Sequence, residues 1–197
     1  MRLLRCQVPV WLMLSLSPAV VWAHGVFPGG GDLANGLLHP FFVPTHLLAL
    51  LGLSLLLGLR GKAHILAGFY AFASALLLGL IGAGMGVASP LAFSLHAVSL
   101  LCGGLAAADV PVKSLVTTLL AAMTGLLLGL DSAPENIGLL SLLMTFAGIL
   151  IGANAGMLGL VGWLTDLKYP WQRVGVRIVG SWITAISLLM LALSSKR

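Results

Sequence analysis

The chain has 197 residues, of which 59% are hydrophobic and only 8% are charged. A soluble domain usually carries charge on about a quarter of its residues, so this chain cannot cover a water-facing surface and requires lipid as its solvent. The net charge of +5 comes from Lys and Arg that stand singly or in pairs between apolar runs. That distribution is typical of membrane-topology signals and does not indicate a nucleic-acid partner.

The N-terminal segment 1–23 has the pattern of a secretory signal peptide. Two arginines precede an apolar stretch, residues 8–21, and the segment ends with the small residue Ala23 at the cleavage position. An uncleaved first helix is the alternative interpretation, because the cleavage context is not ideal. In both cases the following chain starts on the periplasmic side, and residues 24–197 are expected to form one membrane domain.

Hydropathy predicts an all-α membrane bundle of about six helices. A helix needs about 20 apolar residues to cross the hydrocarbon core, and six stretches qualify: 38–59, 63–84, 90–108, 114–130, 137–161 and 174–193. With the mature N-terminus outside, the first, third and fifth breaks are cytoplasmic, and they contain Arg60, Lys62, Lys113, Lys168 and Arg173. The two periplasmic breaks contain no Lys or Arg, as the positive-inside rule requires. We therefore expect a multi-pass protein of the bacterial inner membrane.

Small residues recur at spacings of three and four on two of the predicted helices. They are Gly68, Ala75, Gly79, Gly82 and Gly86 on the second span, and Ser141, Thr145, Gly148, Gly152 and Gly156 on the fifth. These spacings place small residues on one helical face, where helix backbones can approach closely. We interpret both stripes as packing seams, either within one bundle or between copies of the chain.

Three histidines need an explanation, because ionisable groups at membrane depth are costly and usually mark a function. His39 and His46 are seven residues apart, so on an ideal helix they share a face but lie about 10 Å apart along the axis. That is too far for one metal ion. Pro40 and Pro44 remove two backbone donors and are expected to kink or unwind this helix entry, which changes the spacing. His96 is expected at a depth similar to that of His46.

The predicted ligands of a divalent cation are these three imidazoles together with two carboxylates at the periplasmic rim, Asp131 and Glu135. An entering ion would meet the carboxylates first and the imidazoles next, and imidazole suits nickel, zinc, copper and cobalt. Each histidine taken alone could instead bind a backbone carbonyl or a neighbouring hydroxyl. The sequence has no Gly-rich phosphate loop, nucleophile elbow or Cys-x-x-Cys pair, so an enzyme is not expected.

The chain resembles the HupE/UreJ family of small membrane proteins linked to hydrogenase and urease maturation, whose members are regarded as nickel or cobalt permeases. The resemblance covers nearly the whole chain and centres on the family motif H-P-x-x-G-x-D-H, which His39, Pro40 and His46 match. Thr45 stands where the family has its aspartate, and Val43 stands where it has a glycine.

A second family segment, H-G-H-A-H-G-x-E, is matched only at Gly129 and Glu135. Its histidine positions hold Leu128, Leu130 and Ser132 in this chain. The resemblance implies a permease that supplies nickel, or cobalt, for metalloenzyme maturation. It also implies a transported ion in place of a tightly bound cofactor, surrounding membrane lipids, and either further copies of the chain or maturation proteins as partners.

Two other functions stay open at this point. The first is a non-transporting membrane accessory protein that scaffolds a partner complex and has lost the metal site. The second is a haem protein with His46 and His96 as axial ligands from two helices.

Overall fold

Only helices form the regular structure in the part of the chain that the structure describes. The computed structural model describes residues 29–87, 91–133 and 137–194, so the predicted signal peptide and Glu135 lie outside the described residues. The described helices are α2 (Gly31–Phe42), α3 (Pro44–Arg60), α4 (Lys62–Gly84), α5 (Ala92–Ala108), α6 (Ser114–Leu130), α7 (Leu139–Thr165) and α8 (Pro170–Ser194). The predicted all-α class is confirmed.

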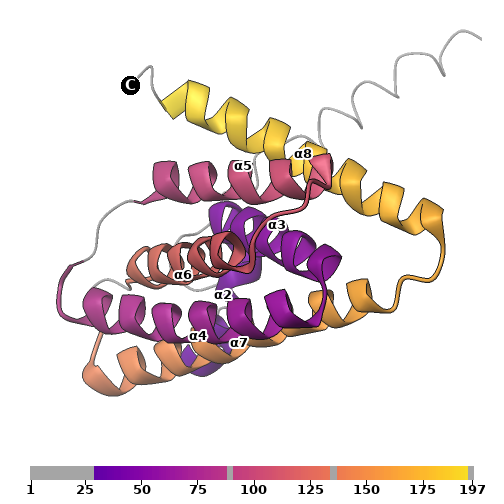
Figure 1. The fold of residues 1–197 in the computed structure, drawn as a ribbon. Coiled ribbons are helices and arrows are strands. Elements are labelled where there is room, and N and C mark those ends of the chain that lie inside the picture. Colours follow the sequence, from indigo (N-terminus) through magenta and orange to yellow (C-terminus); the bar gives the residue numbers. More distant parts are fainter. Residues whose placement is uncertain (1–28, 88–90, 134–136, 195–197) are drawn as a thin grey trace, which may run out of the picture.

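The central helix of the bundle is α3. It contacts every other described helix, and these helices form three close pairs around it: α4 with α6, α5 with α8, and α2 with α7. In Figure 1, α5 and α8 lie above α3 and the helices α4 and α7 lie below it. Leu53, Leu56 and Leu57 of α3 are fully buried. A helix that is apolar all round is expected in such a central position.

Glycines allow the close approach within the three pairs. A Cβ atom on Gly129 of α6 would lie 2.6 Å from the carbonyl oxygen of Leu76 on α4, and one on Gly103 of α5 would lie 2.9 Å from the carbonyl oxygen of Gly180 on α8. No side chain fits at these distances, so the helix backbones are in direct contact. Gly148 of α7 lies in the same way against the backbone of α2. Gly148, and Gly79 of α4 against the backbone of α6, belong to the predicted small-residue stripes, so at these two positions the stripes are seams within one chain.

The first predicted span, residues 38–59, is a bent pair of helices and not one continuous helix. α2 already begins at Gly31, the backbone is extended at Val43, and α3 starts at Pro44 at an angle of 68° to α2. Proline supplies no N–H to a preceding helix, and its fixed φ suits the first turn of a new one. The kink expected from the prolines is confirmed, whereas the early start of α2 was missed because its first turns include polar residues.

The last predicted loop is shorter than expected. α7 continues to Thr165 and α8 begins at Pro170, so Arg173 lies in the first turn of a helix and not in the loop. The side chain of Gln172 accounts for this early start, because its Oε1 accepts hydrogen bonds of 2.9 Å from two backbone N–H groups, those of Lys168 and Tyr169. Such side-chain acceptors stabilise the beginning of a helix.

Three of the described helices, α4, α7 and α8, are long and apolar enough to cross a membrane, and the bent α2–α3 pair can count as a fourth span. α5 and α6 have 17 residues each. That length corresponds to about 26 Å of helix, close to the lower limit for a hydrocarbon core of about 30 Å. The number of six spans therefore stays a prediction.

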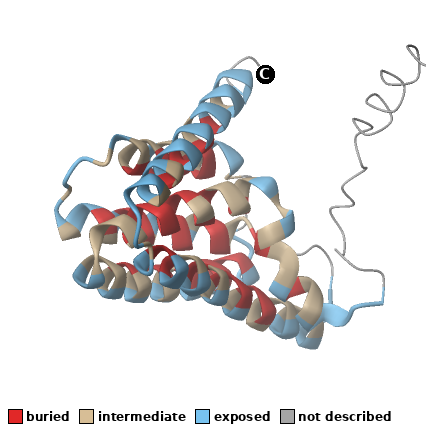
Figure 2. Ribbon diagram, turned by 90° about the vertical axis from the view of Figure 1, so that its right-hand side faces the viewer, coloured by how far each residue is buried: buried red, intermediate tan, exposed pale blue. Residues whose placement is uncertain are grey.

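The outer faces of the bundle are apolar. Leu78 of α4, Leu140 of α7 and Leu189 of α8 are each about 60–70% exposed, and Figure 2 shows exposed positions along the outside of the helices and buried ones inside. Apolar exposure on this scale is rare on soluble monomers, and it is what a lipid-facing surface presents. The structure therefore supports a membrane protein.

The loops lie at two chemically different ends of the bundle. One end, which we call the basic end, contains Arg60, Lys62, Asp109, Lys168 and Arg173, from the first, third and fifth breaks. The other end contains the beginning of α3 and α5 and the end of α6, and we call it the histidine end. The collection of three basic breaks at one end agrees with the alternation of loops inferred from the sequence.

Candidate functional site

The break between α2 and α3 brings two of the predicted ligands together. The ring centroids of His39 and His46 are 5.1 Å apart, and the ring planes are inclined by 64°. On a straight helix the same two residues would be separated by about 10 Å. His46 is the third residue of α3 and is fully buried, whereas His39 is near the end of α2 and is partly exposed. The change of direction after Phe42 therefore brings the two imidazole rings next to each other.

Asp131 is the direct partner of His46. Its Oδ2 lies 3.0 Å from His46 Nε2, and the two side chains are 17% and 0% exposed. The other carboxylate oxygen accepts a hydrogen bond of 2.8 Å from the backbone N–H of Leu91, the residue before α5. Asp131 itself follows the last residue of α6. One carboxylate therefore connects three helix ends, and its role is to hold His46 as well as to contribute negative charge.

Two imidazole nitrogens of this cluster are buried and have no hydrogen-bond partner among the described residues, Nε2 of His39 and Nδ1 of His46. Buried polar atoms are nearly always paired, so each exception needs a reason. When His46 Nε2 carries the proton and donates it to Asp131, Nδ1 keeps a lone pair. A carboxylate that accepts from one ring nitrogen while the other faces a metal is the usual support of a metal-binding histidine.

His96 does not complete a ligand set. It is 3% exposed on α5, and its Nδ1 also has no partner among the described residues. His96 precedes Ser99 by one turn, and Ser99 lies against Gly52 of α3, so the two residues share the α5 face that packs on α3. Within residues 29–87, 91–133 and 137–194, no three His, Cys, Asp or Glu side chains are arranged to hold a metal ion. The expected convergence of three imidazoles is therefore not found there.

The other motif positions have packing roles that the sequence did not reveal. Leu128 is fully buried, Gly129 lies in the α4–α6 contact, and the Ser132 hydroxyl donates a hydrogen bond of 2.6 Å to the Leu128 carbonyl. Thr45, at the position of the family aspartate, is only partly buried. The carboxylate that reaches His46 comes from the end of α6, 85 residues away in sequence, and adjacency in the sequence could not indicate it.

A helical bundle with lipid-facing outer surfaces and a buried histidine–carboxylate pair at a helix break defines an integral membrane protein with a candidate cation site. A family model described as HupE / UreJ protein matches residues 11–190, and the chain belongs to this family. No curated protein and no solved structure matches the chain. Family membership implies an accessory role connected with nickel or cobalt and with hydrogenase or urease.

Proposed function

We propose that this chain is a permease of the bacterial inner membrane that carries nickel, or cobalt, to the maturation of a metalloenzyme. Its mature N-terminus would lie in the periplasm, with the histidine end facing outward. The observation that supports this function best is the pairing of His46 with Asp131 beside His39, at a break in the first membrane segment. The proposal makes the chain a transporter and not an enzyme.

The chemistry of the cluster suits a transition-metal cation that is passed on. Imidazole nitrogens are good ligands for nickel and cobalt, and the negative charge of Asp131 reduces the cost of a cation in a low-dielectric setting. Two imidazoles leave most coordination positions to water or backbone oxygens. A site of this kind binds strongly enough for entry and weakly enough for release, and conduction requires both.

The membrane potential is the proposed driving force, since the sequence contains no nucleotide-binding loop. Moving one elementary charge through 100 mV is worth about 2.3 kcal/mol. A divalent ion that enters a negative interior therefore gains about 4.6 kcal/mol at 100 mV, which by itself would support an inward concentration ratio on the order of a thousandfold.

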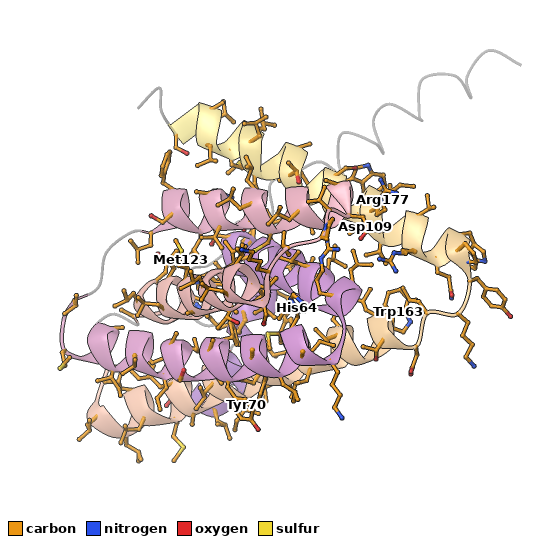
Figure 3. All side chains as sticks on the ribbon, in the orientation of Figure 1. His64, Tyr70, Asp109, Met123, Trp163 and Arg177 are labelled. Atoms are coloured by element: carbon orange, nitrogen blue, oxygen red, sulfur yellow. The ribbon has the colours of Figure 1, made fainter. Side chains whose placement is uncertain are left out.

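Uptake of radioactive nickel in a host without its own nickel transport tests the proposal. We expect uptake above the empty vector for the wild type and near the vector level for His46→Ala and His39→Ala. His64→Ala is the matched control, because His64 Nδ1 lies 3.0 Å from Thr117 Oγ1 in the α4–α6 contact (Figure 3) and belongs to another part of the bundle. Equal uptake by the wild type and His46→Ala would reject the proposed route.

An accessory scaffold without transport is the second candidate function. It is favoured by the residues Leu128, Leu130 and Ser132 at the histidine positions of the family segment, and by the lack of a three-ligand group in the described ranges. Excess nickel in the medium separates the two functions, because it bypasses a missing permease but not a missing scaffold. Recovery of hydrogenase or urease activity at high nickel in a deletion strain would support transport.

A further inference from the structure

The basic end of the bundle contains a cavity of about 740 Å³. The ends of α3 and α7 and the beginnings of α4 and α8 form its walls, together with the loop between α7 and α8. Four of its lining residues are cationic, Arg60, Lys62, Lys168 and Arg173, and none of its described lining residues is acidic. Two helices begin and two end at this cavity, so their dipoles oppose one another and the side-chain charges decide its potential.

Two carboxylates at the basic end, Asp109 and the exposed Asp166, compensate only part of this charge. Asp109 accepts hydrogen bonds of 3.2 Å from Arg60 and of 3.0 and 3.2 Å from Arg173. Arg177 adds a further positive charge beside it, and its Nε donates to the backbone of α5 (Figure 3). Among the described residues no salt bridge joins Lys62 or Lys168 to an acidic side chain. The cavity therefore has a strong positive potential and attracts anions.

Arg60, one of the lining residues of this cavity, also has an unsatisfied donor. Its side chain is 8% exposed, one terminal nitrogen donates to Asp109, and the other donates to the Leu105 carbonyl at 3.1 Å. Its Nε is buried without a partner in the part of the chain that is described. A buried guanidinium N–H without an acceptor is costly, and an anionic oxygen that reached this nitrogen would remove that cost.

The cavity lies at the level where lipid headgroups are expected. Tyr169 is one of its lining residues. Two tryptophans are sequence neighbours of other lining residues: Trp163 precedes Leu164 and is 60% exposed, and Trp171 follows Pro170 and is 70% exposed. Tyr and Trp concentrate at membrane–water interfaces. Figure 3 shows Trp163 at the same end of the bundle as Asp109. A phosphate group carried by a lipid would reach the cavity at this depth.

We propose that this cavity binds a phosphate-bearing anion, and that in the membrane the occupant is the headgroup of an anionic phospholipid. Basic pockets between membrane helices bind anionic headgroups, and arginine pairs closely with phosphate oxygens. Arg60 holds the phosphate from the inside, and the exposed Arg173, Lys62 and Lys168 close around it from the aqueous side. This binding is independent of metal transport, so a failed uptake assay leaves it standing.

Native mass spectrometry of the full chain in neutral detergent tests the proposal. The protein is titrated with phosphatidylglycerol and with phosphatidylcholine of the same acyl chains, and phosphatidylglycerol should bind more tightly. Because one basic residue near a charged lipid is worth about a fivefold change in affinity, Lys168→Gln should weaken phosphatidylglycerol about fivefold and the double variant with Lys62→Gln about 30-fold. Lys113→Gln, an exposed lysine outside the cavity, is the matched control and should bind like the wild type.

Inorganic phosphate distinguishes the two sources of the anion. Failure of millimolar phosphate to displace phosphatidylglycerol would support the lipid headgroup. Phosphate binding that Lys168→Gln weakens, together with equal affinity for both lipids, would support the anion site and overturn its lipid occupant. Equal binding of both lipids and of phosphate by the wild type and the double variant, with unchanged unfolding temperatures, would overturn the proposal altogether.

Discussion

Replacing Asp131 with asparagine tests whether this carboxylate prepares His46 for a metal. Asparagine has the same shape, and its amide oxygen can still accept the hydrogen bond from the Leu91 N–H. In the wild-type protein this bond is 2.8 Å long. The substitution therefore preserves the connection between α5 and α6, removes the negative charge, and replaces the Oδ2 acceptor that lies 3.0 Å from the fully buried His46 imidazole with an N–H donor. Loss of such a supporting carboxylate typically lowers metal affinity 10- to 100-fold, which corresponds to about 1.4–2.7 kcal/mol.

Isothermal titration of nickel into the purified protein measures this change. Asp166→Asn, which removes an exposed carboxylate at the basic end, is the control and should leave the affinity unchanged. Asp131→Ala also removes the acceptor for Leu91 and should lower the unfolding temperature, which Asp131→Asn should not do. If Asp131→Asn binds nickel as tightly as the wild type while His46→Ala does not bind it, the carboxylate does not support the imidazole and the reasoning is refuted.

Three further substitutions test the break, the packing and the basic end. Pro44→Ala restores a backbone donor at the break and favours a continuous helix, which should separate the two imidazoles and weaken nickel binding at least tenfold by the same titration. Gly129→Ala should destabilise the bundle by about 1–3 kcal/mol in thermal unfolding, whereas Gly159→Ala, with no atom near the added methyl group, should not destabilise it. The hydrogen bond from Arg173, with the nearby arginine charges, lowers the pKa of Asp109 below its ordinary 3.8. The resulting stabilisation is present above the ordinary pKa and lost as pH falls through the lowered value, so the unfolding temperature of the wild type should fall below about pH 4 more steeply than that of Asp109→Asn.

Hydropathy and loop charges locate most helices of this fold because both quantities are local. The predicted spans 63–84, 90–108 and 114–130 agree with α4, α5 and α6 to within two residues. The start of α2 could not be found in this way, since its first turns contain polar residues and are stabilised by contact with α7. The proline spacing indicated that a break occurs, but the angle of 68° depends on how α2 and α3 pack on their neighbours.

The sequence predicted the individual residues of the candidate site but not which of them are paired in the fold. The motif around His39 and His46 is local, and the two prolines explain why the rings approach each other. The pairing of His46 with Asp131 depends on which helix ends are adjacent, and hydropathy does not encode the order of helices in a bundle. The position of Asp131 directly after an apolar helix was the available signal. The sequence did not indicate the cavity at the basic end either, because its cationic residues come from two breaks that are distant in sequence.

The two proposed sites are electrostatically coupled if the ion moves from the histidine end toward the basic end. The membrane potential favours inward movement, but an arriving divalent cation meets the charges of Arg60, Lys62, Lys168 and Arg173, which Asp109 offsets only in part by its salt bridges to Arg60 and Arg173. A bound phosphate would lower that repulsion.

Nickel uptake into vesicles should therefore be faster with phosphatidylglycerol than with phosphatidylcholine alone. The Lys62→Gln, Lys168→Gln double variant should transport well in both lipids, because it lacks two of the repelling charges. If the double variant depends on phosphatidylglycerol as strongly as the wild type does, the lipid acts through its general surface charge and not through this cavity.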